Sequence, residues 1–386
     1  MKSHERLKTS LEHKEPDRVP FDFGSTKMTG ITIGAYSRFL KYKGWEDLDP
    51  EPAIFDKIQQ LAGPSENFLS KIKSDTRGIF PSPVTIPAAD EGHSGNDGYM
   101  KIRDEWGIGW RMPEEGGLYY DLYSSPLISG PDSDIRSGYM WPDGSMSRRF
   151  AEMDADIIAK GSSGAGLVMH GFTSGVFEMY QRLRGYENAF VDMLTDEESA
   201  ERFLDKITDA KIAYWDKALG IADGRISVAV EVDDLGTQNS LLISRELYRR
   251  ILMPRHKRLF SFIKKKSPGI RIFLHSCGAV SSVIPDLIEA GIDILNPVQT
   301  SAADMDPAVL KRDFGNDLVF WGGGADTQNI LPRGSPAEVR ENVRRNIEIF
   351  APGGGFVFNT IHNIQADVPP QNIEAMLETL EIYGKY

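Results

Sequence analysis

Short apolar runs recur through the second half of the chain, separated by longer stretches in which apolar and polar residues mix. The runs predict strands at residues 166–172, 226–234, 271–278, 292–299, 318–324 and 355–363. The intervening stretches repeat apolar residues every three or four positions, which predicts helices at 196–219, 244–266, 281–290 and 335–350. A strand followed by a helix, repeated, is typical of a parallel sheet.

The first half of the chain adds elements to this pattern. Residues 4–13 have helical spacing, and the apolar run at 19–24 predicts a first strand. With one more strand expected between residues 30 and 80, the count approaches eight. This favours an α/β fold of the (β/α)8 TIM-barrel type over an open doubly wound sheet. No GxGxxG turn opens a helix, so the chain lacks the phosphate cradle of a dinucleotide-binding sheet.

Residues from about 80 to 150 interrupt the alternation. They are rich in Gly, Pro, Trp and Tyr and have weak periodicity, which predicts hairpins and loops. We expect this segment to be an insertion that caps the barrel near its mouth, within a single barrel domain spanning residues 1–386. Its aromatic residues Trp106, Trp110, Tyr119 and Tyr120 fit either a lid over a flat ligand or a small core under a loop.

Composition narrows the function classes. The net charge of −12 over 386 residues argues against a nucleic-acid-binding protein, which would cluster Lys and Arg. The charged N-terminus lacks the apolar core of a secretory signal, and no apolar run approaches the roughly 18 residues of a membrane span. We therefore expect a cytoplasmic protein without a membrane partner. The single cysteine excludes an internal disulfide, and the long outer helices leave a homodimer open.

Functional groups of a barrel of this type lie where its strands end. The run at 271–278 ends with His275 and Cys277, two positions apart, so both side chains point to the same face of the strand. Imidazole and thiolate are zinc ligands, so the pair makes half of a zinc site. A buried histidine beside an inert core cysteine would give the same pattern.

The last predicted strand ends with a histidine at the corresponding level. All strand ends of an eight-stranded barrel face one mouth, so His362 can reach His275 and Cys277. Three protein ligands and one open position describe a catalytic zinc site. His362 would otherwise contact substrate or orient a ligand.

Other polar residues at the strand ends are candidates for the same mouth, because buried polar groups cost free energy unless they are paired. We predict catalytic roles for the carboxylates of Glu231, Asp233 and Asp234. Substrate-binding roles are predicted for His170, Asn296, Gln299, Asp326, Gln328, Asn363 and Gln365. Each of these residues could instead cap a helix or orient a ligand, and a lone histidine such as His170 is often held by a hydrogen bond.

Four segments resemble the uroporphyrinogen decarboxylase superfamily across nearly the whole chain. They are ERLKTSLEHKEPDRVPFDFG (5–24), HSCG (275–278), DLIEAGIDILNPVQ (286–299) and APGGGFVFNTIHNIQADVPPQNIEAM (351–376). The HxCG motif is similar to the zinc motif of the cobalamin-dependent methyltransferases in that superfamily. The arginine-rich RQAGRY-type segment, with which the decarboxylases hold substrate carboxylates, is absent near this N-terminus. The resemblance therefore favours the methyltransferase branch.

This resemblance implies a function and its partners. It implies a zinc ion held by His275, Cys277 and His362. Members of this branch usually have a cysteine near the end of the last strand, at the eighth position counted from the Gly-Phe pair. Counted from Gly355 in this chain, the eighth position is His362. The implied reaction moves a methyl group between a small methylated substrate, such as a methoxylated aromatic, a methylamine or a thiol, and the cobalt of a corrinoid. Because no DxHxxG corrinoid signature is present, we expect a separate corrinoid protein to dock over the mouth.

Three other functions stay open at this point. A metal-free decarboxylase of a porphyrinogen-like tetrapyrrole would use Asp233 or Asp234 to bind pyrrole N–H groups. A non-catalytic accessory protein would bind the corrinoid protein without turnover. A metal-dependent hydrolase would need a general base near a metal-bound water.

Overall fold

The structure is a computed structural model and describes residues 1–82, 97–129 and 138–386. Seven parallel strands form a curled sheet in the order β12-β11-β10-β9-β8-β7-β3. They are β3 (Thr76–Ile79), β7 (Gly166–His170), β8 (Val228–Val232), β9 (Arg271–His275), β10 (Ile294–Asn296), β11 (Val319–Trp321) and β12 (Phe356–Val357). The six strands from β7 to β12 are shorter than the apolar runs that predicted them, because the residues beyond each strand end turn into loops. β3 is the strand expected between residues 30 and 80.

The segment around Phe21 closes the sheet into a barrel. Phe358, directly after β12, donates its N–H to the Pro20 carbonyl at 2.8 Å, and the Asp75 N–H, directly before β3, donates to the Phe21 carbonyl at 2.7 Å. This short segment therefore occupies the eighth position between β12 and β3. The predicted (β/α)8 barrel is confirmed, with its first strand reduced to a few residues.

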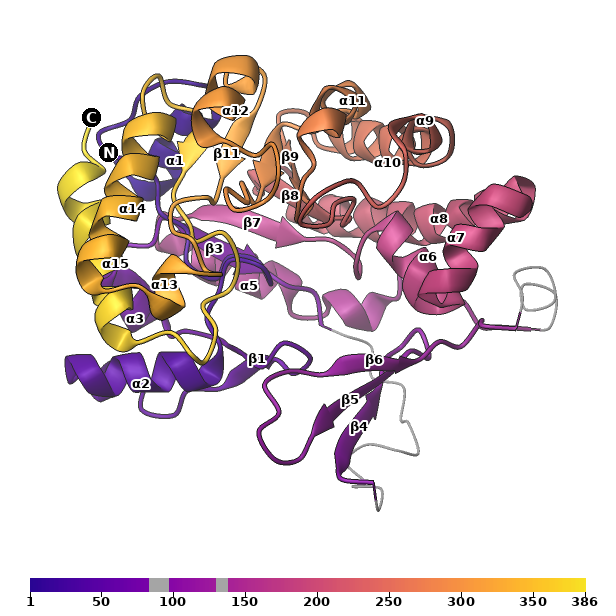
Figure 1. Cartoon of the computed structure of the whole chain (residues 1–386), viewed down its shortest axis with the longest axis horizontal. Coiled ribbons are helices and arrows are strands. Elements are labelled where there is room, and N and C mark those ends of the chain that lie inside the picture. Colours follow the sequence, from indigo (N-terminus) through magenta and orange to yellow (C-terminus); the bar gives the residue numbers. More distant parts are fainter. Residues whose placement is uncertain (83–96, 130–137) are drawn as a thin grey trace.

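Helices surround the barrel, and Figure 1 shows them outside the central strands. The helices that follow or flank barrel strands are α5 (Met153–Ser162), α6 (Val176–Arg184), α7 (Tyr186–Thr195), α8 (Glu197–Ala222), α9 (Arg245–Leu247), α10 (Met253–Lys266), α11 (Ile284–Ala290), α12 (Pro307–Phe314), α13 (Ile330–Arg333), α14 (Pro336–Phe350) and α15 (Pro370–Tyr383). Those near the N-terminus are α1 (Ser3–Leu11), α2 (Ile33–Lys43) and α3 (Glu66–Lys71). Short helical turns are η1 (Glu46–Leu48), η2 (Ser147–Phe150), η3 (Tyr248–Leu252) and η4 (Ser281–Val283).

Two small antiparallel sheets lie outside the barrel. β1 (Ile54–Asp56) pairs with β2 (Leu61–Ala62), and the second sheet contains β4 (Tyr99–Arg103), β5 (Gly109–Pro113) and β6 (Asp121–Ser124). The second sheet lies within the segment from which we expected hairpins, and it stands apart from the barrel strands in Figure 1. The parts of that segment at 83–96 and 130–137 lie outside the described residues.

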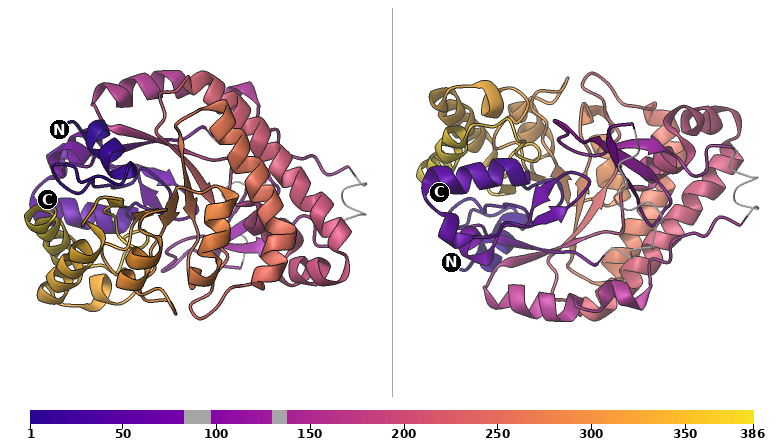
Figure 2. Two further views of the ribbon diagram at one scale, coloured as in Figure 1. Left: turned by 90° about the horizontal axis from the view of Figure 1, so that it is seen from above. Right: turned by 90° about the horizontal axis from the view of Figure 1, so that it is seen from below.

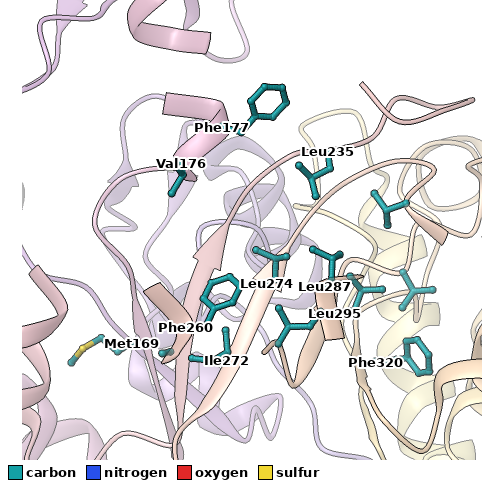
Figure 3. Close-up of a cluster of buried hydrophobic side chains, with 14 of the residues drawn as sticks. Met169, Val176, Phe177, Leu235, Phe260, Ile272, Leu274, Leu287, Leu295 and Phe320 are labelled. Atoms are coloured by element: carbon teal, nitrogen blue, oxygen red, sulfur yellow. The ribbon is translucent and has the colours of Figure 1, made fainter. Parts of the chain in front are cut away.

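Side-chain alternation along the strands creates two apolar layers. Phe273, Ile294 and Val319 belong to the cluster inside the barrel, where Leu7 and Leu11 of α1 also pack. The residues between them face the helices. Figure 3 shows members of this outer layer, including Ile272 and Leu274 of β9 near Phe260 of α10 and Leu287 of α11.

The two chain ends lie on the same side of the molecule (Figure 2). Arg18 and Lys385 form an antiparallel bridge there. Within the described ranges, no helix is both long and apolar enough to cross a membrane.

Candidate functional site

The end of β9 presents His275 to the inside of the barrel. His275 is paired in register with Asn296 of β10, and both follow the inward-facing residues Phe273 and Ile294 by two positions. The Asn296 Nδ2 atom donates to the Trp321 carbonyl at 2.7 Å, which turns its Oδ1 atom toward His275 Nδ1 at 2.5 Å. His275 therefore carries its proton on Nδ1, and its lone pair lies on Nε2.

Cys277 follows in the loop after β9. Its Sγ atom lies 3.2 Å from His275 Nε2, as the alternation of side chains predicted. The Cys277 backbone N–H donates to Asp234 Oδ1 at 2.8 Å, and the same carboxylate oxygen lies 3.9 Å from His275 Nε2. Asp234, at the end of β8, thus fixes the loop that carries the cysteine.

His362 completes a cluster with these two residues. It lies in the loop beyond β12, five residues after Val357 and not at a strand end as expected, and the ring centroids of His275 and His362 are 5.5 Å apart. One ligand atom from each of His275, Cys277 and His362 lies within 4.8 Å of the others. The structure therefore brings together the three residues that we predicted to hold a metal.

Burial controls the protonation of this cluster. It lowers the pKa of His362 to about 3 and also lowers the pKa of His275, so both rings are neutral near pH 7 and offer lone pairs. Burial raises the pKa of the Cys277 thiol well above its usual value, as do the charges of Asp234 and Glu178. A thiolate here needs a compensating cation, which a divalent metal would supply.

A cavity of about 490 Å³ opens beside the cluster, and His275, His362 and Asp234 line it. Its walls come from the ends of β7 and β8, the N-terminal part of α6, the loops near residues 27 and 56–59, and residues 104–120 of the outer sheet. The cavity thus lies at the carboxyl ends of the barrel strands, where sites of this fold are found.

Two further predicted residues share this cavity. Asp234 lines it, and burial raises the pKa of its carboxyl. His170, at the end of β7, is buried, lines the cavity and has a pKa lowered to about 3 by burial. Its ring stacks on Phe80 with centroids 5.7 Å apart.

Glu231 and Asp233, predicted to be catalytic, do not line the cavity. They alternate with the inward-facing Val230 and Val232, so both point outward between β8 and the helices. Glu231 accepts a hydrogen bond from Trp215 Nε1 at 2.6 Å and pairs with Lys211 at 2.9 Å. Asp233 accepts the N–H groups of Phe177 and Glu178, and lies 2.8 Å from His256 Nε2. Their contacts are structural.

The predicted amides and Asp326 also lie outside the cavity wall. Asn296 orients His275, Gln299 accepts the Gly278 N–H at 2.8 Å, and Asp326 accepts the N–H groups of Gln328 and Asn329. The remaining three hold loops: Gln328 accepts from Ser301, Asn363 accepts the Gly30 N–H, and Gln365 donates to the Asn363 carbonyl. These six residues hold the strand ends and loops of the mouth and do not line the cavity.

The sequence did not single out the charged residues of the cavity wall. Glu178 and Arg182 form an ion pair one turn apart on α6, and Glu178 Oε2 is buried. Helix α6 starts close against β8, because a Cβ atom on Gly175 would lie 1.9 Å from the Val232 carbonyl oxygen. The i,i+4 spacing was a visible signal, but it is ordinary on helix surfaces. The other charged wall residues are Lys27, Asp56, Asp104, Glu105 and Arg149.

Aromatic residues of the outer sheet contribute to both of the structures that we expected. Trp106, Trp110 and Tyr120 line the cavity, whereas Tyr119 is about half exposed elsewhere. Trp106 also packs on Phe172, with ring centroids 5.4 Å apart. The segment is therefore both a cavity wall and a small core.

Comparison with known proteins places this chain in a family. Residues 154–383 match the model of the uroporphyrinogen decarboxylase (URO-D) family. A methylated-thiol–coenzyme M methyltransferase of Methanosarcina mazei is 28% identical over 65% of this chain and 66% of its own length. A uroporphyrinogen decarboxylase of Alkalilimnicola ehrlichii is 24% identical over 98% of this chain and 93% of its own.

A solved structure shows the same fold. A methyltransferase from Methanosarcina mazei superposes with a TM-score of 0.65 at 15% identity, and the match covers 99% of each chain. The family model alone spans more than half of the chain, from α5 to the end of α15. The chain therefore belongs to the uroporphyrinogen decarboxylase (URO-D) family.

Proposed function

We propose that this protein is a zinc-dependent methyltransferase that moves a methyl group between a small methylated substrate and the cobalt of a corrinoid on a separate protein. The observation that carries the proposal is the cluster of His275, Cys277 and His362, of which the two histidines line the mouth cavity. The similarity to a methylated-thiol methyltransferase supports the same reaction class. The substrate would be a methoxylated aromatic, a methylamine or a thiol.

The donor set fits zinc. Two neutral imidazoles and one thiolate make three protein ligands and leave a fourth position for substrate, as in catalytic zinc sites. When bound, zinc would act as a Lewis acid that polarises the heteroatom bearing the methyl group, or lowers the pKa of a thiol acceptor. Compared with a site of one histidine and two cysteines, a second neutral ligand makes the metal the stronger acid.

The neighbouring residues orient the ligands of this cluster, and one of them can transfer a proton to the substrate. Asn296 keeps His275 in the tautomer that offers Nε2, and Asp234 holds the backbone of Cys277. Burial and the charges of Asp234 and Asp233 raise the pKa of Glu178, while Arg182 lowers it. Glu178 therefore holds a proton more readily than an exposed glutamate, and it can pass one to a leaving heteroatom.

A metal-free decarboxylase of a polycarboxylate tetrapyrrole is the main alternative, since many relatives carry that name. The cavity charges disfavour it. Each cation of the wall already has a carboxylate partner: Lys27 with Asp56, Arg149 with Glu105 and Arg182 with Glu178. A substrate with many carboxylates would meet no unpaired cation on this wall.

A methyl-transfer assay with chemically reduced cob(I)alamin tests the proposal. The zinc-loaded protein is mixed with cob(I)alamin and one donor of each class, and the loss of cob(I)alamin absorbance is followed. We expect the wild type to consume cob(I)alamin with at least one donor. Cys277→Ala should consume it no faster than the mixture without protein. The matched control is Gln365→Leu, which alters an amide of the same mouth that donates to the Asn363 carbonyl and does not line the cavity. A folded, zinc-loaded wild type that consumes no cob(I)alamin with any donor class would count against the proposal.

A further inference from the structure

Polar atoms without partners gather around the mouth cavity. Four cavity-lining side chains each have a buried polar atom that makes no hydrogen bond to the described part of the chain. They are Trp106 Nε1, Arg149 Nε, His170 Nε2 and Glu178 Oε2. Buried polar groups are nearly always paired in folded proteins, because an unmade hydrogen bond costs free energy. Such a concentration at one cavity indicates a ligand that brings its own donors and acceptors.

The hydrogen-bonding role of His170 can be assigned. His170 is 6% exposed, and its Nδ1 atom lies 3.3 Å from the Gly171 carbonyl oxygen. A carbonyl only accepts, so the proton lies on Nδ1, and Nε2 is left as a lone-pair acceptor. A ligand group that meets His170 Nε2 must therefore be a donor, such as a hydroxyl.

Aromatic side chains supply much of the remaining wall. Phe80 stacks on His170, while Trp106 and Phe172 pack together at 5.4 Å between ring centroids. Trp110 and Tyr120 line the same cavity. Rings of this kind favour a flat apolar ligand over a flexible one.

The charges of the wall select against anions. Carboxyl groups outnumber cations by five (Asp56, Asp104, Glu105, Glu178, Asp234) to three (Lys27, Arg149, Arg182). All three cations are already paired with carboxylates. Without zinc in the site, a ligand carboxylate would therefore meet no unpaired cation on the wall, whereas a neutral ring needs none.

We propose that the substrate is a neutral aromatic ring that carries both the methylated heteroatom and a hydrogen-bond donor, as a methoxyphenol does. The inference rests on the proposed methyl transfer and selects one of its substrate classes. The ring lies between the aromatic walls, and its hydroxyl donates to His170 Nε2. The methylated oxygen then faces the end of the cavity formed by His275, His362 and Glu178.

Ligand binding tests this inference without any methyl transfer. Because Trp106 and Trp110 line the cavity, quenching of tryptophan fluorescence reports occupancy, and it is measured in the zinc-free protein so that no probe can coordinate a metal. The probes are 2-methoxyphenol, methoxybenzene and 2-methoxybenzoate. We expect 2-methoxyphenol to bind saturably, methoxybenzene about tenfold more weakly for the lost hydrogen bond, and 2-methoxybenzoate most weakly.

A variant of His170 tests where the hydroxyl of 2-methoxyphenol binds. His170→Phe keeps a ring beside Phe80 and removes the acceptor, so 2-methoxyphenol should lose its advantage over methoxybenzene. The control is His4→Phe, an exposed position on α1. Since the three probes also discriminate in the wild type, the inference stays testable if the variant does not fold.

The outcomes separate this inference from the proposed function. Methyl transfer from an amine or a thiol, with no binding of 2-methoxyphenol, would overturn the inference and leave the function. Binding of 2-methoxyphenol in the expected order, without methyl transfer, would support this ligand class and count against the function. Tightest binding of 2-methoxybenzoate would overturn the inference, because it would require an unpaired cation in the wall.

Discussion

The buried polar side chains at the two ends of the barrel differ in how their hydrogen bonds are paired. At the end where the strands begin, Asp75 is fully buried and accepts hydrogen bonds from Arg6, Arg18 and the Phe21 N–H. At the mouth, Glu178 and His170 each keep a buried polar atom without a partner in the described chain. At the first end the buried carboxylate is fully paired within the chain, whereas the mouth leaves these two side-chain atoms without a partner in the described residues.

This difference separates the polar residues that stabilise the fold from those that belong to the candidate site. The Asp75 network ties the N-terminal segment to β3 and so closes the barrel, as expected of the end of this fold that serves stability. The mouth instead keeps neutral histidines and a thiol whose pKa values are shifted by burial. Strongly shifted groups in a cavity are the mark of a functional site.

The largest expected effect is on stability and comes from removing the buried Asp75 carboxylate. Asp75→Ala removes the acceptor of Arg6 Nη1, of the Arg18 guanidinium and of the Phe21 N–H, and leaves Arg6 paired with Asp17 alone. The free energy of unfolding should fall by about 3–5 kcal/mol, because several buried donors lose their partner at once. Urea denaturation measures this change. Asp313→Ala, which removes an exposed pair with Arg312, should leave stability unchanged. Equal losses in the two variants would show that the buried Asp75 network contributes no more to stability than an exposed ion pair.

A smaller effect is expected at the mouth from Asn296→Leu. Without the Asn296 oxygen, His275 no longer has a fixed tautomer, and zinc affinity should fall about 10–100-fold while the metal can still bind. Competition with a chromophoric zinc chelator measures the affinity. Gln365→Leu is the control, and unchanged affinity in Asn296→Leu would show that the tautomer does not depend on this contact.

The smallest effect concerns the pH dependence of stability. Burial lowers the pKa of His170 to about 3, whereas an unfolded histidine titrates near about 6.5. Between these values only the unfolded state binds the proton, so His170 favours folding fully above about pH 6.5 and progressively less as pH falls. The slope of unfolding free energy against pH should be smaller in His170→Phe by about 1.4 kcal/mol per pH unit between pH 4 and 6. Parallel slopes in denaturation curves of variant and wild type would contradict a buried neutral His170.

Much of the fold could be predicted from the sequence. The apolar runs and the helical spacing identified six barrel strands and the helices α1, α8, α10, α11 and α14, because burial against a core imposes these periods directly. The meeting of His275, Cys277 and His362 also followed, since two of them share a strand face and all strand ends open to one mouth.

The roles of the other polar residues could be predicted less well. Residue type and strand end do not say which way a side chain points. Alternation from the inward-facing Val230 and Val232 would have placed Glu231 and Asp233 outside the barrel. The amides of the mouth, such as Asn363, have loop N–H groups as partners that no local pattern reveals.

The cavity wall depends on contacts distant in sequence. Lys27, Arg149 and Arg182 come from three separate segments, and the outer sheet supplies Trp106 and Trp110. Tertiary packing brings these residues together, and the periodicity of each segment does not predict which other segments it will meet.

The central claim is that the mouth holds a three-ligand metal site, and zinc content tests it most directly. Wild type, Cys277→Ala, His362→Ala and the control Gln365→Leu are purified without chelators and analysed for metal. We predict about one zinc per chain in wild type and control, and loss of zinc in both ligand variants. A folded wild type without metal, or variants that keep full zinc, would contradict the account.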